Sequence, residues 1–332
     1  MPATAPVLGL ARVTALRPES PDDDWDVQLE RAGGHFLQSL AWQRVQRRLG
    51  YAVVAERRPG WLWTGSVRVG AFPRYLYVPY GPAGGDLDAA LQSVADAARE
   101  RRLDFARVEP LAAPSGDALA RLRARRVKPV QPRWTSVLDL TQTEEALRRG
   151  LSAGHRGSIN AAPRRGIVIA RNPGTASAET FVALERATKA RTGYAGRRPG
   201  YYRAILETLQ PLHSASLYVA EAAGSVIAAA ICFDFASTRY YAYAASDPVA
   251  GRKLGAAVPL VWRMILDARS EGRRVFDFWG VAPPGAPDHR WAGFTQFKRA
   301  FGGRLLERPG AWELEIHALR HRLFSLAQTV RR

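Results

Sequence analysis

The first half of the chain shows hydrophobic positions that alternate between helical and strand spacing. Apolar residues that recur every three or four positions predict a helix, and short apolar runs between glycine and proline predict strands. By these criteria we expect helices at 35–49 and around 87–98, and strands at 61–69, 74–78 and 105–108. The turn Pro79-Tyr80-Gly81-Pro82 ends the second strand, and Glu109-Pro110 ends the third.

The pattern restarts at about residue 141. Thr141 and Glu144 have the spacing of a capping box, and a basic helical stretch follows as far as Ala162, where Pro163 ends it. We therefore expect a domain boundary at this point. Beyond it, the expected helices are 178–192, 200–209 and 256–270, and the expected strands are 217–221, 226–235, 239–244 and 275–278.

Two stretches, one in each half, have a similar pattern. Each consists of a helix end, an arginine pair and a short aromatic strand: AARERRLDFARV and DARSEGRRVFDFW. This similarity predicts two copies of one α/β unit. We expect an α/β (α+β) fold with two domains and mixed sheets.

Composition fits a two-domain protein. The chain has 332 residues, 47% of them hydrophobic, which is ample for two cores. Cys232 is the single cysteine, so an internal disulfide or a cysteine-bound zinc is not expected. No apolar run approaches the ~20 residues of a membrane span, and the N-terminus has no positive region like that of a signal peptide. These features favour a cytoplasmic protein.

The net charge is strongly positive, at +18. Such a charge favours phosphate-rich partners. However, 44 of the 48 basic residues are arginine, which also fits a general preference of this chain for arginine. Both interpretations stay open, and charge alone does not identify the partner.

Familiar catalytic motifs are absent from the sequence. None of the six histidines has an obvious nucleophile or metal partner nearby in the chain. His317 and His321 are one helical turn apart on a basic helix that carries no carboxylate pair, so we expect them to be solvated and not metal ligands. There is no serine-hydrolase elbow, Walker loop, HExxH or GxGxxG. We therefore expect neither a metal nor a cofactor.

The segment WAGFTQFKRAFGG, residues 291–303, predicts a short amphipathic helix after the strand and turn FDFWGV. Its pattern places Phe294, Phe297 and Phe301 toward the core, with Lys298 beside them. Taken alone, this pattern is typical of an aromatic-packed helix whose lysine extends to solvent. The motifs elsewhere in the chain favour a different role.

The chain resembles the Fem family, tRNA-dependent aminoacyl transferases that add bridge amino acids to peptidoglycan precursors. The resemblance runs from about residue 35 to 315 and rests on these motifs in order: HFLQSLAWQRVQRRLGY, VPYGPAGG, RVEP, HRGSINAAPRRGIVI, FVALERATKARTGY with RPGYYRAIL, IAAAICFDF with YYAYAAS, FDFWGV and FTQFKRAFGG. It implies two tandem acetyltransferase-like (GNAT) domains, one formed by 1–140 and completed by 311–332, the other by 141–310.

The resemblance also implies roles for single residues. Lys298 matches the active-site lysine, and Glu109 lies where an acidic residue precedes proline, a candidate to orient or deprotonate the amine. Arg191 matches a basic residue that contacts the precursor's diphosphate. The other candidate substrate-binding residues are Tyr194 and Tyr243, near tyrosines of that pocket, and Gln38, Trp42 and Arg156, within the matching motifs.

The implied reaction uses aminoacyl-tRNA as co-substrate. The acceptor would be the side-chain amine in the stem peptide of UDP-MurNAc-pentapeptide or its lipid-linked descendant. An aminoacyl ester is already activated, so no cofactor is needed. The sequence departs from the family at Gln46, where some members have a diphosphate-binding lysine, and it lacks the pair of heptad helices that some relatives carry.

Two other functions stay open. The segment 252–257, RKLGAA, fits a loop that cradles a pyrophosphate at a helix start, which would suit a GNAT-type acyltransferase using acyl-CoA. Alternatively, the protein binds tRNA or an anionic membrane without catalysis. The basic terminal segment HALRHRLFSLAQTVRR could lie on a membrane or pack on the first domain.

Overall fold

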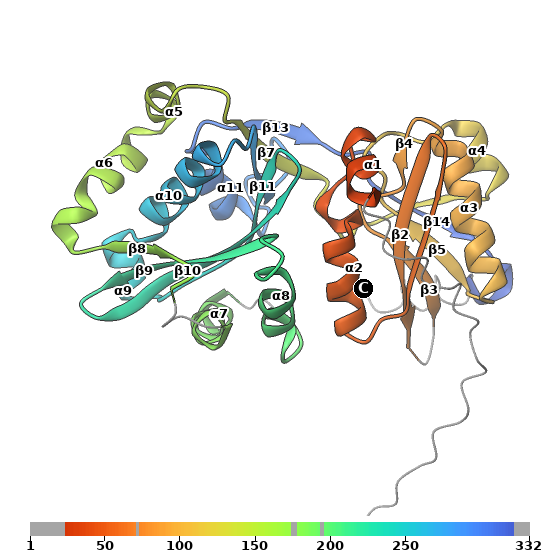
Figure 1. The fold of residues 1–332 in the computed structure, drawn as a ribbon, viewed down its shortest axis with the longest axis horizontal. Helices are drawn as coiled ribbons and strands as arrows, with labels where there is room; N and C mark the ends of the chain where they lie inside the picture. The colour runs from red at the N-terminus through yellow and green to blue at the C-terminus, as the bar shows by residue number, and fades with distance from the viewer. Residues whose placement is uncertain (1–23, 71–72, 174–177, 193–195, 322–332) are drawn as a thin grey trace, which may run out of the picture.

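The protein forms two α/β bodies side by side, each built around one seven-stranded sheet (Figure 1). The structure is a computed structural model and describes residues 24–70, 73–173, 178–192 and 196–321. Among these residues, no helix is both long and apolar enough to cross a membrane.

The first sheet has the strand order β1-β2-β3-β5-β14-β6, with β4 paired to β2. Its strands are β1 (Val53–Arg58), β2 (Trp61–Val69), β3 (Arg74–Val78), β4 (Ala83–Gly84), β5 (Phe105–Val108), β6 (Arg125–Val127) and β14 (Ala311–Glu315). The helices of this half are α1 (Trp25–Arg31), the short η1 (Phe36–Gln38), α2 (Leu40–Arg48), α3 (Leu87–Glu100) and α4 (Gly116–Arg121).

The second sheet has the order β13-β7-β12-β11-β10-β9-β8. Its strands are β7 (Trp134–Asp139), β8 (Val168–Arg171), β9 (Ala215–Ala222), β10 (Ser225–Phe235), β11 (Thr238–Ser246), β12 (Val275–Gly280) and β13 (Arg304–Glu307). Its helices are α5 (Glu144–Gly150), α6 (Ala153–Ala161), the short η2 (Pro163–Arg165), α7 (Ala178–Thr192), α8 (Tyr201–Leu209), α9 (Ala250–Leu254), α10 (Ala257–Ser270) and α11 (Ala292–Arg299).

The two similar sequence stretches form the same structural unit in both sheets. β3 and β5 pair in parallel and are joined through α3, while β11 and β12 pair in parallel and are joined through α10. Both connecting helices have 14 residues. The mixed α/β fold and the duplicated unit expected from the sequence are therefore present.

Some boundaries differ from those expected. β7 pairs with β12 and β13, so the chain enters the second sheet before the boundary expected at 141. The segment 35–49 divides into η1 and α2, because the Ser39 hydroxyl accepts the Trp42 amide hydrogen and caps a new helix. Thr143, not Thr141, caps α5, while the Thr141 hydroxyl donates to Asp139.

The end of the chain returns to the first sheet, where β14 pairs with both β5 and β6. Most of the basic terminal segment HALRHRLFSLAQTVRR, residues 322–332, lies outside the described residues.

A shared hydrophobic core joins the two halves. Phe36 and Trp42, from η1 and α2, pack with Phe233 of β10 at ring-centroid distances of 4.6 and 5.9 Å. Helices α7 and α8 contribute to the same cluster, including Phe181 and Ile205. η1 and α2 of the N-terminal half therefore pack, together with α7 and α8, on one face of the second sheet.

Candidate active site

Lys298 lies where two parallel strands separate. The ladder between β11 and β12 joins three residue pairs and ends at Tyr240 opposite Asp277, although both strands continue beyond it. Lys298, on α11, donates a hydrogen bond from Nζ to the Gly280 carbonyl at 2.7 Å. Nζ is also 5.8 Å from the centre of the Tyr241 ring. The ammonium thus reaches the open end of the strand pair.

Burial changes the chemistry of this lysine. It lowers the pKa of Lys298 to about 8, and the charge of Asp277 opposes the shift. The lysine therefore does not extend freely to solvent. Of the three phenylalanines expected to face the core, Phe297 and Phe301 do so, but Phe294 is 51% exposed, because α11 is short and presents its first turn to solvent.

Asp277 is a functional candidate that the sequence reasoning missed. Its Oδ1 accepts hydrogen bonds from the Thr135 hydroxyl and, at 2.7 Å, from the Trp279 amide. Its Oδ2 lies 3.9 Å from a guanidinium nitrogen of Arg308. Burial raises the pKa of Asp277, whereas these hydrogen bonds and the charges of Arg308 and Lys298 lower it. A buried carboxylate with two cations nearby suits an electrostatic role.

The carboxylate of Asp277 also stabilises an irregular end of strand β12, through its hydrogen bond from the Trp279 amide. The register between β12 and β7 shifts between Asp277 and Gly280, and Trp279 there has φ of +60°. A large side chain rarely adopts this conformation, so surrounding contacts must stabilise it. The bulge presents the Gly280 carbonyl to Lys298, and strand bulges commonly redirect groups in this way.

An aromatic cluster connects this strand end to the N-terminal half. The ring of His35 lies 4.4 Å from Tyr80, 4.5 Å from Tyr240 and 5.3 Å from Trp279, centroid to centroid. Burial lowers the pKa of His35 well below its usual value, and the charge of Arg308 lowers it further. His35 is therefore neutral near pH 7 and fills the junction as an aromatic ring.

Glu109 is buried on the N-terminal side of the junction. Its carboxylate accepts hydrogen bonds from the amides of Val130 (2.6 Å) and Gln131 (3.0 Å) and from the Tyr77 hydroxyl (3.0 Å). Burial raises the pKa of Glu109 to about 7, although these hydrogen bonds and Arg107 oppose the rise. The pKa suits a base, but the three bonds indicate that the carboxylate fixes the segment before β7.

Gln38 and Trp42 are both structural in this conformation. Gln38 is fully buried, and its amide donates to the carbonyls of Thr64 and Pro79 at 2.9 and 2.7 Å. Both of its amide hydrogens are thus used within the protein. Trp42 is 8% exposed and belongs to the shared core. Neither side chain offers a substrate contact here, because each one joins η1 or α2 to its neighbours.

Tyr243 lies in a group of aromatic side chains with a cation above it. Its hydroxyl is 2.7 Å from that of Tyr201, the first residue of α8, and the guanidinium of Arg197 lies 5.8 Å from its ring centre. Phe233 packs on both Tyr243 and Trp279, at 6.0 and 6.3 Å. Tyr243 and the strand end beside Lys298 thus border the same aromatic core.

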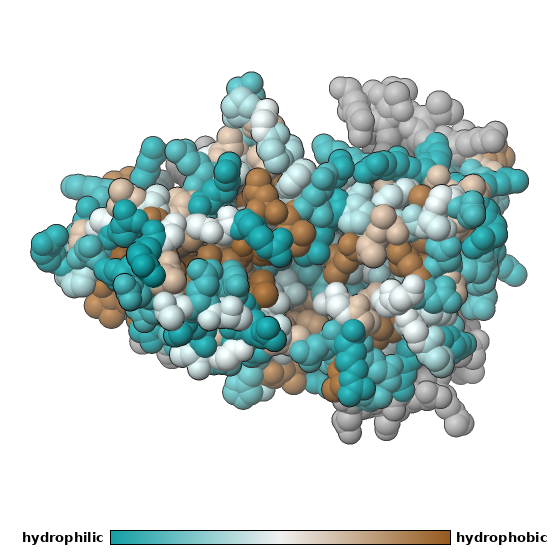
Figure 2. Space-filling model, turned by 90° about the horizontal axis from the view of Figure 1, so that it is seen from above, coloured by the Kyte–Doolittle hydropathy of each residue, from teal (hydrophilic) through white to brown (hydrophobic). Residues whose placement is uncertain are grey.

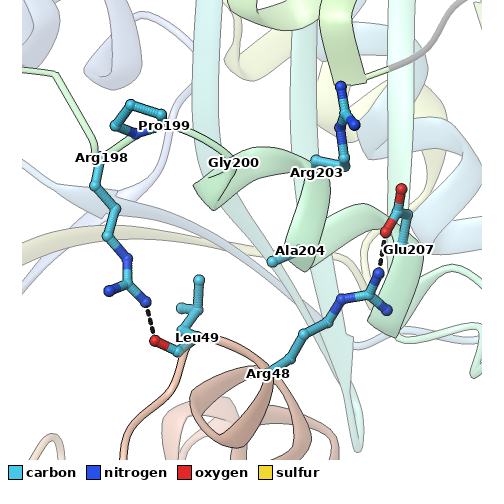
Figure 3. Close-up of a pocket in the computed structure, with 8 residues that line it drawn as sticks. All are labelled: Arg48, Leu49, Arg198, Pro199, Gly200, Arg203, Ala204 and Glu207. Atoms are coloured by element: carbon cyan, nitrogen blue, oxygen red, sulfur yellow. Dashed lines mark hydrogen bonds and ion pairs between the residues drawn. The ribbon is translucent and has the colours of Figure 1, made fainter. Parts of the chain in front are cut away.

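A pocket of about 320 Å³ lies between α2 and the start of α8 (Figure 3). Arg48 pairs with Glu207 across the pocket, and Arg198 donates to the Leu49 carbonyl. Arg203 also lines the pocket and pairs with Glu179. Both halves of the protein contribute arginines to the pocket, but Arg48 and Arg203 are already paired with carboxylates.

The structure does not place the other three candidate substrate-binding residues beside Lys298. Tyr194 is outside the described residues, and Arg191 lies on α7, but its side chain is not described. Arg156 is on α6, at the far end of the second half, where it donates to the Leu151 carbonyl. The structure therefore does not bring Arg156 together with Lys298 in one pocket.

The segment 252–257 spans the end of α9, the turn Gly255-Ala256 and the first residue of α10. The amides of Gly255 and Ala256 donate to the carbonyls of Arg252 (3.2 Å) and Gly251 (3.0 Å). These two amides are therefore engaged within the turn. Within the described ranges, no cluster of three or more His, Cys, Asp or Glu residues is arranged to hold a metal ion.

Comparison with known proteins agrees with this architecture. Residues 149–299 match the acetyltransferase (GNAT) domain family. FemX has a similar structure, with a TM-score of 0.78 and 17% identity, covering 90% of this chain and 97% of FemX. The C-terminal domain of a putative lysylphosphatidylglycerol synthetase from Agrobacterium fabrum gives a TM-score of 0.60 and 15% identity, covering 91% of this chain and 95% of that one.

A tandem GNAT protein from the clavulanic acid biosynthesis pathway is similar as well. Its TM-score is 0.53 at 14% identity, covering 89% of this chain and 96% of that protein. The sequence has no significant match among curated proteins. The chain thus has a tandem GNAT fold like that of FemX, as its resemblance to the Fem family implied.

Proposed function

We propose that this protein transfers an amino acid from aminoacyl-tRNA to the side-chain amine of a peptidoglycan precursor stem peptide. The observation that carries the proposal is the half-buried Lys298 ammonium, held on the Gly280 carbonyl where β11 and β12 separate. This arrangement, within a fold like that of FemX, supports acyl transfer. The precursor would be UDP-MurNAc-pentapeptide or its lipid-linked form.

In this mechanism, the neutral amine attacks the ester carbonyl of the aminoacyl-tRNA. A C–N bond forms, negative charge develops on the carbonyl oxygen, and the C–O bond to the tRNA ribose then breaks. The Lys298 ammonium would stabilise the negative charge. The proton released by the amine would pass to the departing ribose oxygen or to water. Glu109 would then act by fixing the segment 130–131 rather than by contacting the amine.

The carrier can be tested directly. We expect transfer from labelled aminoacyl-tRNA to precursor, with the product identified by mass spectrometry, and we expect RNase to abolish it. The competing reaction uses acyl-CoA at the 252–257 turn, but two amides of that turn are engaged internally. Transfer from acyl-CoA that survives RNase would establish the CoA reaction instead. The Lys298→Ala variant serves as the catalytic control in both arms.

Arg191 provides a test of the acceptor. Arg191→Ala should weaken precursor binding about 10- to 100-fold, because a charge-assisted hydrogen bond contributes ~1.5–3 kcal/mol. Calorimetric titration with the soluble precursor measures this effect. The matched control is Arg186→Ala, an exposed arginine on the same helix, which should bind normally. Equal affinity of the two variants would remove Arg191 from the binding site.

A further inference from the structure

A face rich in arginine covers one end of the second half, where α5, α6, η2 and α9 lie (Figure 1). The 33 residues between Glu145 and Glu179 include six arginines and no acidic residue. Hydrophilic side chains dominate this end of the molecule in Figure 2. We define the basic face as Arg148, Arg149, Arg156, Arg164, Arg165, Arg252 and Lys253, all of them exposed or partly exposed.

Direct contacts hold the separate segments of the basic face together. Arg165, in η2, donates to the carbonyl of Leu254, at the end of α9, at 2.8 Å. Arg148, Arg149 and Arg156 line a shallow pocket of about 310 Å³ together with Glu145. The face is therefore a fixed surface assembled from segments about 90 residues apart in the sequence.

The cations of this face are not neutralised by direct ion pairs within the described residues. Arg148 donates to the side-chain oxygen of Asn160, and Arg156 donates to the Leu151 carbonyl, so these partners are uncharged. Within the described part of the chain, no cation of the basic face forms an ion pair with a carboxylate, whereas Arg48, Arg203 and others do. The acidic Glu145 lines the same pocket but makes no such pair. A concentrated field of this kind attracts polyanions.

Helix α6, which carries Arg156 of the basic face, contacts the helix that carries Lys298. His155 of α6 donates from Nε2 to the Phe297 carbonyl at 3.1 Å, and its ring packs on Phe301 at 4.5 Å. The Ser152 amide donates to the Ala300 carbonyl at 2.9 Å. A polyanion on this face would therefore lie next to α11, on the same half of the protein as the catalytic lysine.

The surface chemistry favours a phosphate backbone over a membrane. Gly154 and Gly157 on α6 have open space above them, so the backbone there can be approached closely. Membrane-binding helices present tryptophan, phenylalanine or leucine anchors. The exposed large apolar residues next to the segments of this face are two valines, Val168 and Val249, and the exposed Phe294 lies on the neighbouring α11. We propose that the basic face binds the phosphate backbone of the carrier RNA, which rests on the function proposed above.

The test compares two charge-matched variants. Arg149, Arg164 and Arg252 are exposed, so the triple variant Arg149→Gln, Arg164→Gln, Arg252→Gln should fold normally. The control changes three exposed cations of the first half: Arg31→Gln, Arg121→Gln and Lys128→Gln. Binding of deacylated bulk tRNA is measured by fluorescence anisotropy across a salt series. Binding to vesicles with and without phosphatidylglycerol is measured in parallel.

We expect the basic-face variant alone to lose affinity for tRNA, by about tenfold or more near 0.1 M salt. The slope of the logarithm of the tRNA association constant against log[salt] is negative. Its magnitude should decrease by about 0.7–0.9 for each phosphate that the variant no longer neutralises. Equal tRNA affinity of the two variants would overturn the proposal, and so would loss of vesicle binding with tRNA binding intact. Failure of the proposed function would look different: wild-type protein would bind tRNA through this face without transferring an amino acid.

Discussion

Replacing Lys298 with alanine should lower the rate of aminoacyl transfer by about 10²–10³-fold, as is common when one oxyanion-stabilising donor is removed. Substrate binding should change far less, because the ammonium acts on charge that develops only in the transition state. Single-turnover rates with saturating precursor and charged tRNA measure the effect. Near-wild-type transfer by Lys298→Ala would exclude the catalytic role.

The pH dependence of transfer gives this role a second test. The pKa of Lys298 is lowered to about 8, so the ammonium is present below that pH and lost above it. Because the acceptor amine must be neutral to attack, the wild-type profile should be bell-shaped, with its alkaline limb near pH 8. Lys298→Arg should remain below the wild-type rate but lose the alkaline limb, since a guanidinium stays protonated.

The sequence predicted the regular elements best where glycine and proline bound them. β2 and β3 have the limits expected for them, because glycine or proline flanks each apolar run on both sides. β5 also has its expected limits and ends just before Glu109-Pro110. β7 was not predicted, since its short run lies just before the point where a new helical pattern begins. Its place in the second sheet depends on pairing with β12 and β13, which local sequence does not encode.

The candidate site was only partly visible in the sequence for a similar reason. Lys298 stood out because it is one of four lysines and lies in a motif that resembles the Fem family. Asp277 did not, since Thr135, its hydrogen-bond partner, is 142 residues away in the chain. An aspartate between two phenylalanines in a buried strand was the one available signal. Gln38 matched a family motif, but its amide hydrogens bond to backbone carbonyls.

Asp277→Asn separates the charge of this residue from its hydrogen bonds. An asparagine oxygen can still accept from Thr135 and the Trp279 amide, so the bulge should persist. The loss of negative charge, however, removes the interaction that raises the pKa of Lys298. The alkaline limb of the transfer rate should therefore move to lower pH. An unchanged limb would mean that Asp277 does not act on Lys298 through its charge.

Asp277→Ala should have a larger effect, because it removes both the charge and the acceptor that holds Trp279 at positive φ. Removing one member of a buried charge network typically costs ~3–5 kcal/mol of folding stability. Transfer should fall by about 10²–10³-fold, the loss that is common when an oxyanion-stabilising donor is no longer held in place. Thermal unfolding of the variant distinguishes a local effect from loss of the fold. The matched control is Thr135→Val, which removes the hydrogen bond from the Thr135 hydroxyl to Asp277 but no charge. If the Gly280 carbonyl positions Lys298, Thr135→Val should lower the transfer rate modestly and leave the alkaline limb in place. A wild-type transfer rate in Asp277→Ala would show that neither the bulge nor the carboxylate supports Lys298.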